Sequence, residues 1–175
     1  MAGTGTPLVG RPGRPRPGPG PAARVTAHKK PVSVLVVIHT PALEVLLLER
    51  KGHPGYWQSV TGSQEGEEAL DRTAQREVLE ETGIDAQHYR LTDWQLTNRF
   101  EIFLEWRHRY APGVTHNIEH VFSLEVPDRL PVRLAPDEHL AYRWLPWEQA
   151  AAEVFSWSNR DAILDLPRRF PPAAR

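Results

Sequence analysis

Residues 68–82 form a run of strong helix formers without proline or glycine, and Gly83 follows it where helices often end. The run predicts one continuous helix. At 100° per residue, Glu77 and Glu81 fall on the stripe that also carries Leu70, so both carboxylates would point toward the core. Any fold for this chain must therefore accommodate acidic side chains on the inward face of a helix.

Three carboxylates cluster on this helix, because Glu80 lies three residues from Glu77 and next to Glu81. Most charge runs are solvated faces, but the stripe position argues against that interpretation here. Like charges four residues apart destabilise a bare helix, and partial burial adds to the cost. Oxygen ligands favour Mg²⁺ or Mn²⁺ over zinc or copper, and Mg²⁺ usually also binds water and substrate phosphates. The cluster predicts a divalent metal site that acts on a phosphate substrate.

Residues around the cluster have more than one interpretation. Arg76 points to a different side of the helix, where it can orient a glutamate or serve as a surface arginine. Glu68 lies in the predicted first turn, where it can contact the metal or complement the helix dipole. Gly62 is expected to give the chain a flexible loop entry to the helix.

Composition excludes several classes of protein. At 175 residues the chain is long enough for one domain, and its net charge of −1 gives no basic field for nucleic acid. The absence of cysteine excludes disulfides, thiolate zinc sites and cysteine nucleophiles. No apolar run reaches the roughly 20 residues that span a bilayer, and the N-terminus lacks a secretory signal. We expect a cytoplasmic protein.

The first residues differ from the rest of the chain. Residues 1–24 are rich in proline and glycine, with arginine as their only charged residue, so they cannot bury enough apolar surface to offset their ordering entropy. We predict a disordered extension over residues 1–28 and a folded domain over residues 29–170. An organelle transit peptide is the alternative, although such peptides are amphipathic and serine-rich and this segment is neither.

Apolar patterning predicts an α/β sandwich with a mixed β-sheet, because strands surround the central helix and further helix follows. Residues 31–39 form an almost continuous β-branched run, typical of a strand buried on both faces. Two helices are expected near the end, over 147–155 behind Pro146 and over 159–165 behind Ser158 as a cap. The other expected strands are 45–50, 90–97, 100–109, 118–126 and 140–145.

The acidic helix also carries a recognisable motif. Gly62 is followed by Glu68 and then, after seven residues, by Arg76-Glu-Val-Leu-Glu-Glu-Thr-Gly-Ile84, which is the full Nudix box. The chain is therefore identified as a member of the Nudix hydrolases, which cleave the diphosphate link of substrates built on a nucleoside diphosphate. The resemblance implies that Glu77, Glu80 and Glu81 hold divalent metal ions and that Arg76 positions the glutamates.

One position departs from the family pattern. Family members usually have glycine directly before the first conserved glutamate, whereas this chain has Glu67 there and its glycine at Gly66. The departure affects the expected backbone path of the loop but not the ligands on the helix.

The resemblance extends over about residues 29–165 to one bacterial Nudix subfamily, which converts dihydroneopterin triphosphate to the monophosphate and pyrophosphate in folate synthesis. The segments that carry this likeness are 30–38, 56–63, 100–103, 107–115, 138–145 and 156–160. It implies a further metal ligand, Glu138, which could also bring a general base near the attacking water. It also implies substrate contacts from Lys29, Arg50, Thr61, Phe100, Glu101, Ile102, Phe103 and Ser156.

These implied contacts suit the substrate chemically. Lys29 and Arg50 can neutralise phosphate charge, while Thr61 and Glu101 can hydrogen-bond the edge of a pterin. The phenylalanines at 100 and 103 can stack on the flat ring, but strand alternation would instead place one or both in the core.

A basic cluster and several histidines complete the candidates. Arg107, His108 and Arg109 precede a Tyr-Ala-Pro-Gly turn, and they either bind the triphosphate or fix the turn. Five histidines lack metal-ligand spacing and are interpreted as structural, namely His39, His88, His116, His120 and His139.

We therefore expect a hydrolase that uses Mg²⁺, or Mn²⁺ in its place, to cleave the α–β linkage of a small-molecule triphosphate. Partners from nucleic acid or membranes are not expected, and the chain would be a monomer or homodimer. A Nudix pyrophosphatase for ordinary or oxidised nucleoside triphosphates is the alternative, because guanine and pterin present similar edges. A ligand sensor that no longer hydrolyses is a remote alternative, since all four box glutamates are present.

Overall fold

A computed structural model describes residues 28–171, so that all of the predicted N-terminal extension except His28 lies outside the described residues. Within that range no helix is long and apolar enough to cross a membrane. The strands are β1 (Val32–His39), β2 (Glu44–Arg50), β3 (Trp57–Gln58), β4 (Val60–Ser63), β5 (Arg90–Glu101), β6 (His116–Glu125) and β7 (His139–Pro146). The helices are α1 (Leu70–Thr82), α2 (Trp147–Glu153) and α3 (Trp157–Arg169), with 3₁₀ turns η1 (Ala86–His88) and η2 (Leu104–Arg109).

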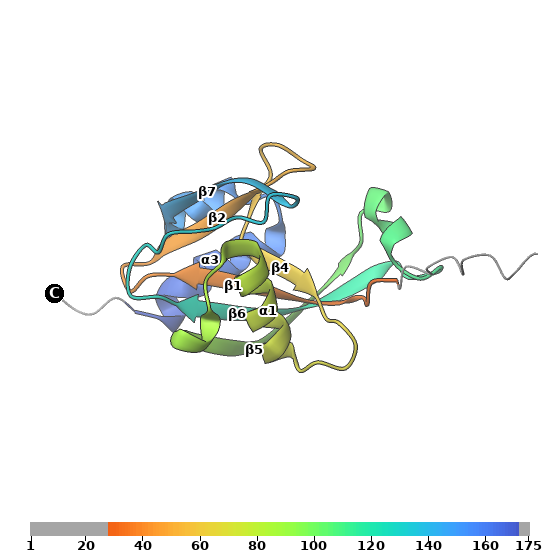
Figure 1. Cartoon of the computed structure of the whole chain (residues 1–175), viewed down its shortest axis with the longest axis horizontal. Coiled ribbons are helices and arrows are strands. Elements are labelled where there is room, and N and C mark those ends of the chain that lie inside the picture. The colour runs from red at the N-terminus through yellow and green to blue at the C-terminus, as the bar shows by residue number, and fades with distance from the viewer. Residues whose placement is uncertain (1–27, 172–175) are drawn as a thin grey trace, which may run out of the picture.

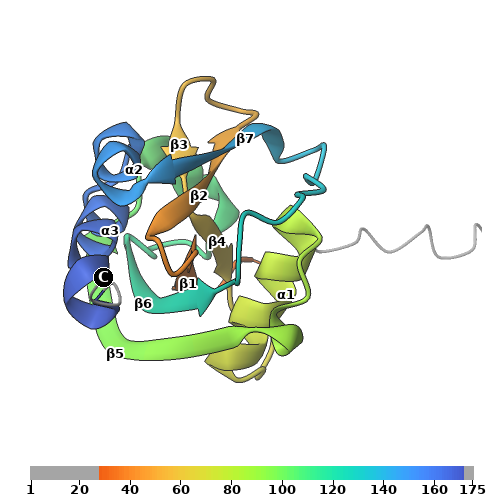
Figure 2. The same ribbon diagram turned by 90° about the vertical axis from the view of Figure 1, so that its left-hand side faces the viewer.

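The strands form one seven-stranded mixed sheet in the order β3-β2-β1-β6-β5, with β4 paired to β1 and β7 paired to β2. The pairing of β1 with β6 is parallel and the other pairings are antiparallel. Figure 2 shows α1 on one face of this sheet and α2 and α3 on the other. The predicted α/β sandwich with a mixed sheet is confirmed.

Side chains on β1 alternate between two apolar cores, which explains its continuous run of branched residues. Val34 and Val36 pack with residues of α1, including Val78, on one face of the sheet. Leu35 and Val37 pack on the other face with residues of α2 and α3. The sheet is thus buried on both sides, and α1 is fixed by its own apolar stripe.

The sheet opens between β1 and β2. These strands pair at His39 and Val45, close to the turn that joins them. Beyond that point β1 takes β4 as its neighbour, while β2 takes β3 and β7. The two halves of the sheet therefore diverge, and a cleft forms at the open end.

The predicted strand over 100–109 is wrong. Strand β5 continues to Glu101, and the chain then turns through η2. The Trp106 amide donates to the Phe103 carbonyl at 2.9 Å at the start of this turn. Leu104 is 79% exposed and no residue of η2 is buried, so this segment does not pack against the sheet. The end of β5, η2 and the start of β6 extend from the body as an arm (Figure 1).

Two helix boundaries also differ from the prediction. Helix α1 begins at Leu70 rather than at residue 68. Its last residue is Thr82, and Gly83 follows as the predicted C-cap with a left-handed φ of 72°. The cap of α3 is Ser156, which accepts a hydrogen bond from the Asn159 amide at 3.4 Å. Ser158, the predicted cap, is instead a buried helical residue.

Candidate active site

A cleft of about 810 Å³ occupies the open end of the sheet. Its lining comes from β2, β4, α1, the β5–η2 arm, β6, the loop before β7 and the start of α3. Every site residue predicted from the sequence lies along it, namely Lys29, Arg50, Thr61, Arg76, Glu77, Glu80, Glu81, Phe100, Glu101, Ile102, Phe103, Glu138 and Ser156. Their individual roles remain predictions.

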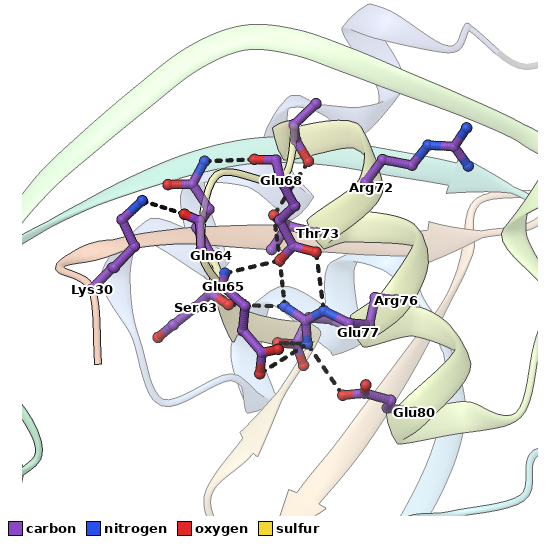
Figure 3. A network of polar contacts seen from close by, with 12 residues as sticks. Lys30, Ser63, Gln64, Glu65, Glu68, Arg72, Thr73, Arg76, Glu77 and Glu80 are labelled. Carbon is purple, nitrogen blue, oxygen red and sulfur yellow. Dashed lines mark hydrogen bonds and ion pairs between the residues drawn. The ribbon is translucent and has the colours of Figure 1, made fainter. Parts of the chain in front are cut away.

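Arg76 connects the loop before α1 to the helix itself (Figure 3). Its guanidinium donates to Glu68 at 2.7 Å, to the Ser63 carbonyl at 3.0 Å, to Glu77 at 2.8 Å and to Glu80 at 3.2 Å. The side chain is 22% exposed. Of the two interpretations, the structure favours the arginine that orients glutamates.

Glu68 lies outside the first turn of α1, where the sequence placed it, and its contact with a metal ion stays a prediction. It precedes α1 and accepts hydrogen bonds from Arg76, from the Thr73 hydroxyl at 3.1 Å and from the Glu65 amide at 2.9 Å. The bond from Arg76, together with those from Glu65 and Thr73, lowers the pKa of Glu68 to about 2. Glu68 is therefore ionised at neutral pH and holds Arg76 in place.

Gly62 lies in strand β4, so the predicted flexible loop entry is wrong. A Cβ atom at this position would lie 1.8 Å from Cδ of Glu77, far inside van der Waals contact. Any other residue here would displace the Glu77 side chain, which packs against the backbone of β4.

Burial makes the carboxylates of α1 unusual. Burial first, and then the charge of Glu81, raise the pKa of Glu77 to about 7. Burial also raises the pKa of Glu81, although its bond to His139 opposes that effect. Glu80 is different, because its side chain is 54% exposed at the mouth of the cleft. Two buried carboxylates with raised pKa values fit a cation, which would stabilise their charged form.

Glu81, Glu138 and His139 form a second part of this centre. Their ligand atoms lie within 4.8 Å of one another, so together they could hold a metal ion. His139 contacts Glu81 through Nε2 at 3.0 Å, and both side chains are 2% exposed. The histidine was predicted to be structural, and only its place beside Glu138 in the sequence could have pointed to this contact.

Two basic residues face these carboxylates. Burial lowers the pKa of Arg50 and of Lys29, and the nearby charge of Arg109 lowers the pKa of Lys29 further. Arg50 donates to Gln58 at 2.9 Å and lies 5.0 Å from the Trp106 ring centroid. Its Nε has no hydrogen-bond partner among residues 28–171. A desolvated cation with an unused donor suits an anionic ligand.

Aromatic rings line the arm side of the cleft. Phe103 is 55% exposed and packs edge-on against Trp106 with ring centroids 5.1 Å apart. Neither Phe103 nor Phe100 belongs to the two apolar cores, so the alternative that placed them there is wrong. Arg107 donates to the Ile102 carbonyl at 3.0 Å and to Glu101, so its side chain holds η2 against the end of β5 rather than the Tyr-Ala-Pro-Gly turn, whereas Arg109 lines the cleft.

Comparison with known proteins decides the family, because the model of the NUDIX domain matches residues 29–166. The chain belongs to the NUDIX family. It is 50% identical over 139 residues to dihydroneopterin triphosphate diphosphatase of Escherichia coli K12, covering 78% of this chain and 91% of that protein. The enzyme of the same name from Haemophilus influenzae is 40% identical over 140 residues, covering 78% and 87%.

A solved structure agrees with these relatives. The E. coli dihydroneopterin triphosphate pyrophosphohydrolase superimposes with a TM-score of 0.76 at 48% identity, covering 82% of this chain and 99% of that one. The Nudix box of this chain runs from β4 through α1. Its altered loop is held by Lys30, which donates to the Gly66 carbonyl at 2.5 Å and pairs with Glu67 at 3.4 Å. Gly66 itself has a left-handed φ of 50°.

Proposed function

We propose that this Nudix protein hydrolyses dihydroneopterin triphosphate to dihydroneopterin monophosphate and pyrophosphate, with Mg²⁺ as its metal and Mn²⁺ able to replace it. The observation that carries the proposal is one cleft that joins buried carboxylates, desolvated cations and exposed aromatic rings. A triphosphate with a flat head group needs the carboxylates for its metal ion, the cations for its phosphates and the aromatic rings for its head group. Relatives at 50% and 40% identity that are named for this reaction support the choice of head group.

The metal would be held by Glu77 and Glu81, with Glu80 and Glu138 at its exposed side. The donor set fits a hard cation, because these four side chains offer oxygen atoms and the two buried ones need positive charge. His139 would hold Glu81 in orientation through its 3.0 Å contact. Bound Mg²⁺ would supply Lewis acidity toward the phosphate oxygens and a nucleophilic water at neutral pH.

The protein's own groups do the remaining work. Arg50 and Lys29 bind phosphate oxygens, which compensates the desolvation of their charges. Arg76 keeps Glu77 in place at 2.8 Å. Glu138 is exposed to the cleft and can accept the proton released by the attacking water.

The test is product analysis after incubation with dihydroneopterin triphosphate in ¹⁸O-labelled water. The proposal predicts pyrophosphate and the monophosphate as products, with the label in one of them identifying the phosphorus attacked. A parallel assay uses dATP, GTP and 8-oxo-dGTP. A higher kcat/KM for any of these nucleotides than for the pterin substrate would overturn the proposal in favour of a nucleotide pyrophosphatase.

The wider setting of the protein remains a prediction. We propose a small-molecule substrate as its partner, a cytoplasmic location, and a monomer or homodimer. Retained binding of the triphosphate without release of phosphate in Mg²⁺ buffer would indicate the alternative of a ligand sensor.

A further inference from the structure

The floor of the cleft contains two buried polar residues that none of the roles above uses. Asn117 and Glu119 lie on β6 and are 2% and 5% exposed, yet both line the cleft. They are two residues apart on one strand, so they project from the same face. Their cross-strand partners on β5 are Phe100 and Asn98, which share that face.

The hydrogen bonding of this pair is incomplete. Asn117 donates through Nδ2 to the Ser33 hydroxyl at 2.7 Å, but its Oδ1 has no partner among the described residues. Turning the amide over would bond Oδ1 to the same hydroxyl and leave Nδ2 free instead. In both orientations one amide atom is buried beside the cleft without a hydrogen-bond partner. This costs free energy, which a hydrogen bond to a ligand atom would recover.

Glu119 is a buried acid that is bonded only to neutral groups. Its Oε1 accepts from Asn98 Nδ2 at 3.3 Å, and within residues 28–171 it forms no ion pair. Burial raises the pKa of Glu119, while the Ser158 hydroxyl and Asn98 oppose that rise. A carboxylate has about four acceptor positions, so this one retains capacity for further donors.

The ligand chemistry that suits this pair is a ring edge with two adjacent donors. A 2-amino-4-oxopyrimidine ring presents a ring N–H beside an exocyclic amino group, and one carboxylate can accept from both. The same edge occurs in pterins and in guanine. Phe100, directly across from Asn117, supplies an aromatic surface beside the polar pair.

We propose that Asn117 and Glu119 form the subsite that recognises the 2-amino-4-oxopyrimidine edge of the substrate's head group. Glu119 accepts from the ring N–H and the amino group, and Asn117 uses its free amide atom on the neighbouring polar atom of the ring. This assignment rests on the proposed function for the choice of a pterin, but its chemistry applies equally to guanine.

The test compares substrates that differ only at this edge. GTP presents both donors, ITP lacks the amino group, and ATP lacks the whole donor pattern. We expect the wild-type protein to prefer GTP to ITP. In Glu119→Gln, which keeps the size of the side chain, kcat/KM for GTP and for dihydroneopterin triphosphate should fall about tenfold to a hundredfold through KM. Turnover of ATP should not change.

Glu125→Gln is the matched control, because it removes a carboxylate from the same strand outside the cleft. An equal loss for all four triphosphates in Glu119→Gln would show a structural role and overturn the proposal. The proposal would also be overturned if the wild-type protein had equal kcat/KM values for GTP and ITP and bound both equally well at equilibrium without metal. This comparison needs no variant.

The two proposals fail in different ways. If the protein prefers GTP to the pterin substrate, the proposed function is wrong, whereas a GTP preference lost in Glu119→Gln still supports the subsite. If the pterin substrate is hydrolysed best and Glu119→Gln does not affect it, the subsite is wrong and the proposed function stands.

Discussion

The two ends of the cleft are built in different ways. The catalytic end, formed by Glu77, Glu81 and Arg76 of α1 with their partners, is largely local in sequence. All of the hydrogen-bond acceptors of Arg76 lie within 13 residues of it in the sequence. The recognition end, formed by η2 and the facing ends of β5 and β6, depends on distant pairings, and Asn117 bonds Ser33 across 84 residues. Most of the reaction chemistry is thus encoded in one segment, to which Glu138 and His139 are added from a distant part of the chain, while substrate choice requires the whole sheet.

The electrostatics of the two ends differ as well. At the catalytic end burial disfavours the charges of Glu77 and Glu81, and a neighbouring carboxylate repels each of them, Glu81 in the case of Glu77 and Glu138 in the case of Glu81. At the recognition end Glu119 is isolated and bonded to neutral donors. The first arrangement suits a metal ion, and the second suits neutral hydrogen-bond donors of a ligand.

The largest expected effect is at the catalytic end. Glu77→Gln or Glu81→Gln should lower kcat roughly a thousandfold, because each removes a metal ligand worth several kcal/mol in the transition state. Both variants should fold, since glutamine removes a buried charge. Asp71→Asn, on an exposed position of the same helix, is the control and should keep full activity. Near-normal turnover in both glutamine variants would rule out the metal assignment.

The second effect concerns stability against pH in the metal-free protein. Glu77 has a pKa of about 7 when folded against 4.5 as its ordinary value, so the folded state retains a proton that the unfolded chain releases. The stabilisation is complete below about pH 4.5 and is lost as the pH rises through 7, a change of about 3 kcal/mol. Urea unfolding with EDTA at several pH values measures it.

Two variants separate this effect from other titrations. Glu77→Gln should reduce the fall in stability between pH 4.5 and 7 by about 3 kcal/mol and leave the part that comes from Glu81 and Glu119, whose pKa values burial also raises. Glu68 acts in the opposite direction, because its pKa is lowered to about 2 and its stabilisation is lost only as the pH falls below 4.5. Glu68→Gln should therefore leave the fall at neutral pH in place. A Glu77→Gln protein with the wild-type profile would contradict the burial argument.

A smaller effect is expected from the backbone that supports the catalytic end. Gly62→Ala would place a methyl group 1.8 Å from Cδ of Glu77, so the carboxylate must move. A displacement of about 1 Å should reduce kcat roughly a hundredfold. Gly52→Ala is the control, because a Cβ there meets no atom within 4 Å. Equal activity of the two variants would show that Glu77 tolerates displacement.

The same difference between the ends explains what the sequence could predict. Helix α1, strand β1 and the candidate box glutamates follow from periodicity and spacing within short segments, and the structure confirms the helix and the strand. The strand predicted over 100–109 failed because nothing local shows that the segment leaves the sheet after Glu101. Asn117, Glu119 and His139 were not identified as site residues, since their partners come from distant strands and from α1.

The smallest expected effect lies in the arm at the recognition end. Phe103 is 55% exposed and contributes to the cleft rather than to the core, so Phe103→Ala should leave the melting temperature unchanged. Loss of one stacking surface should raise KM for the pterin substrate about twofold to tenfold and leave kcat unchanged. Leu104→Ala removes an even more exposed apolar side chain next to it, outside the cleft, and should change neither parameter. A fall in kcat in Phe103→Ala as large as that in Gly62→Ala would mean that the arm positions the reacting phosphate, and the division between the two ends would then be wrong.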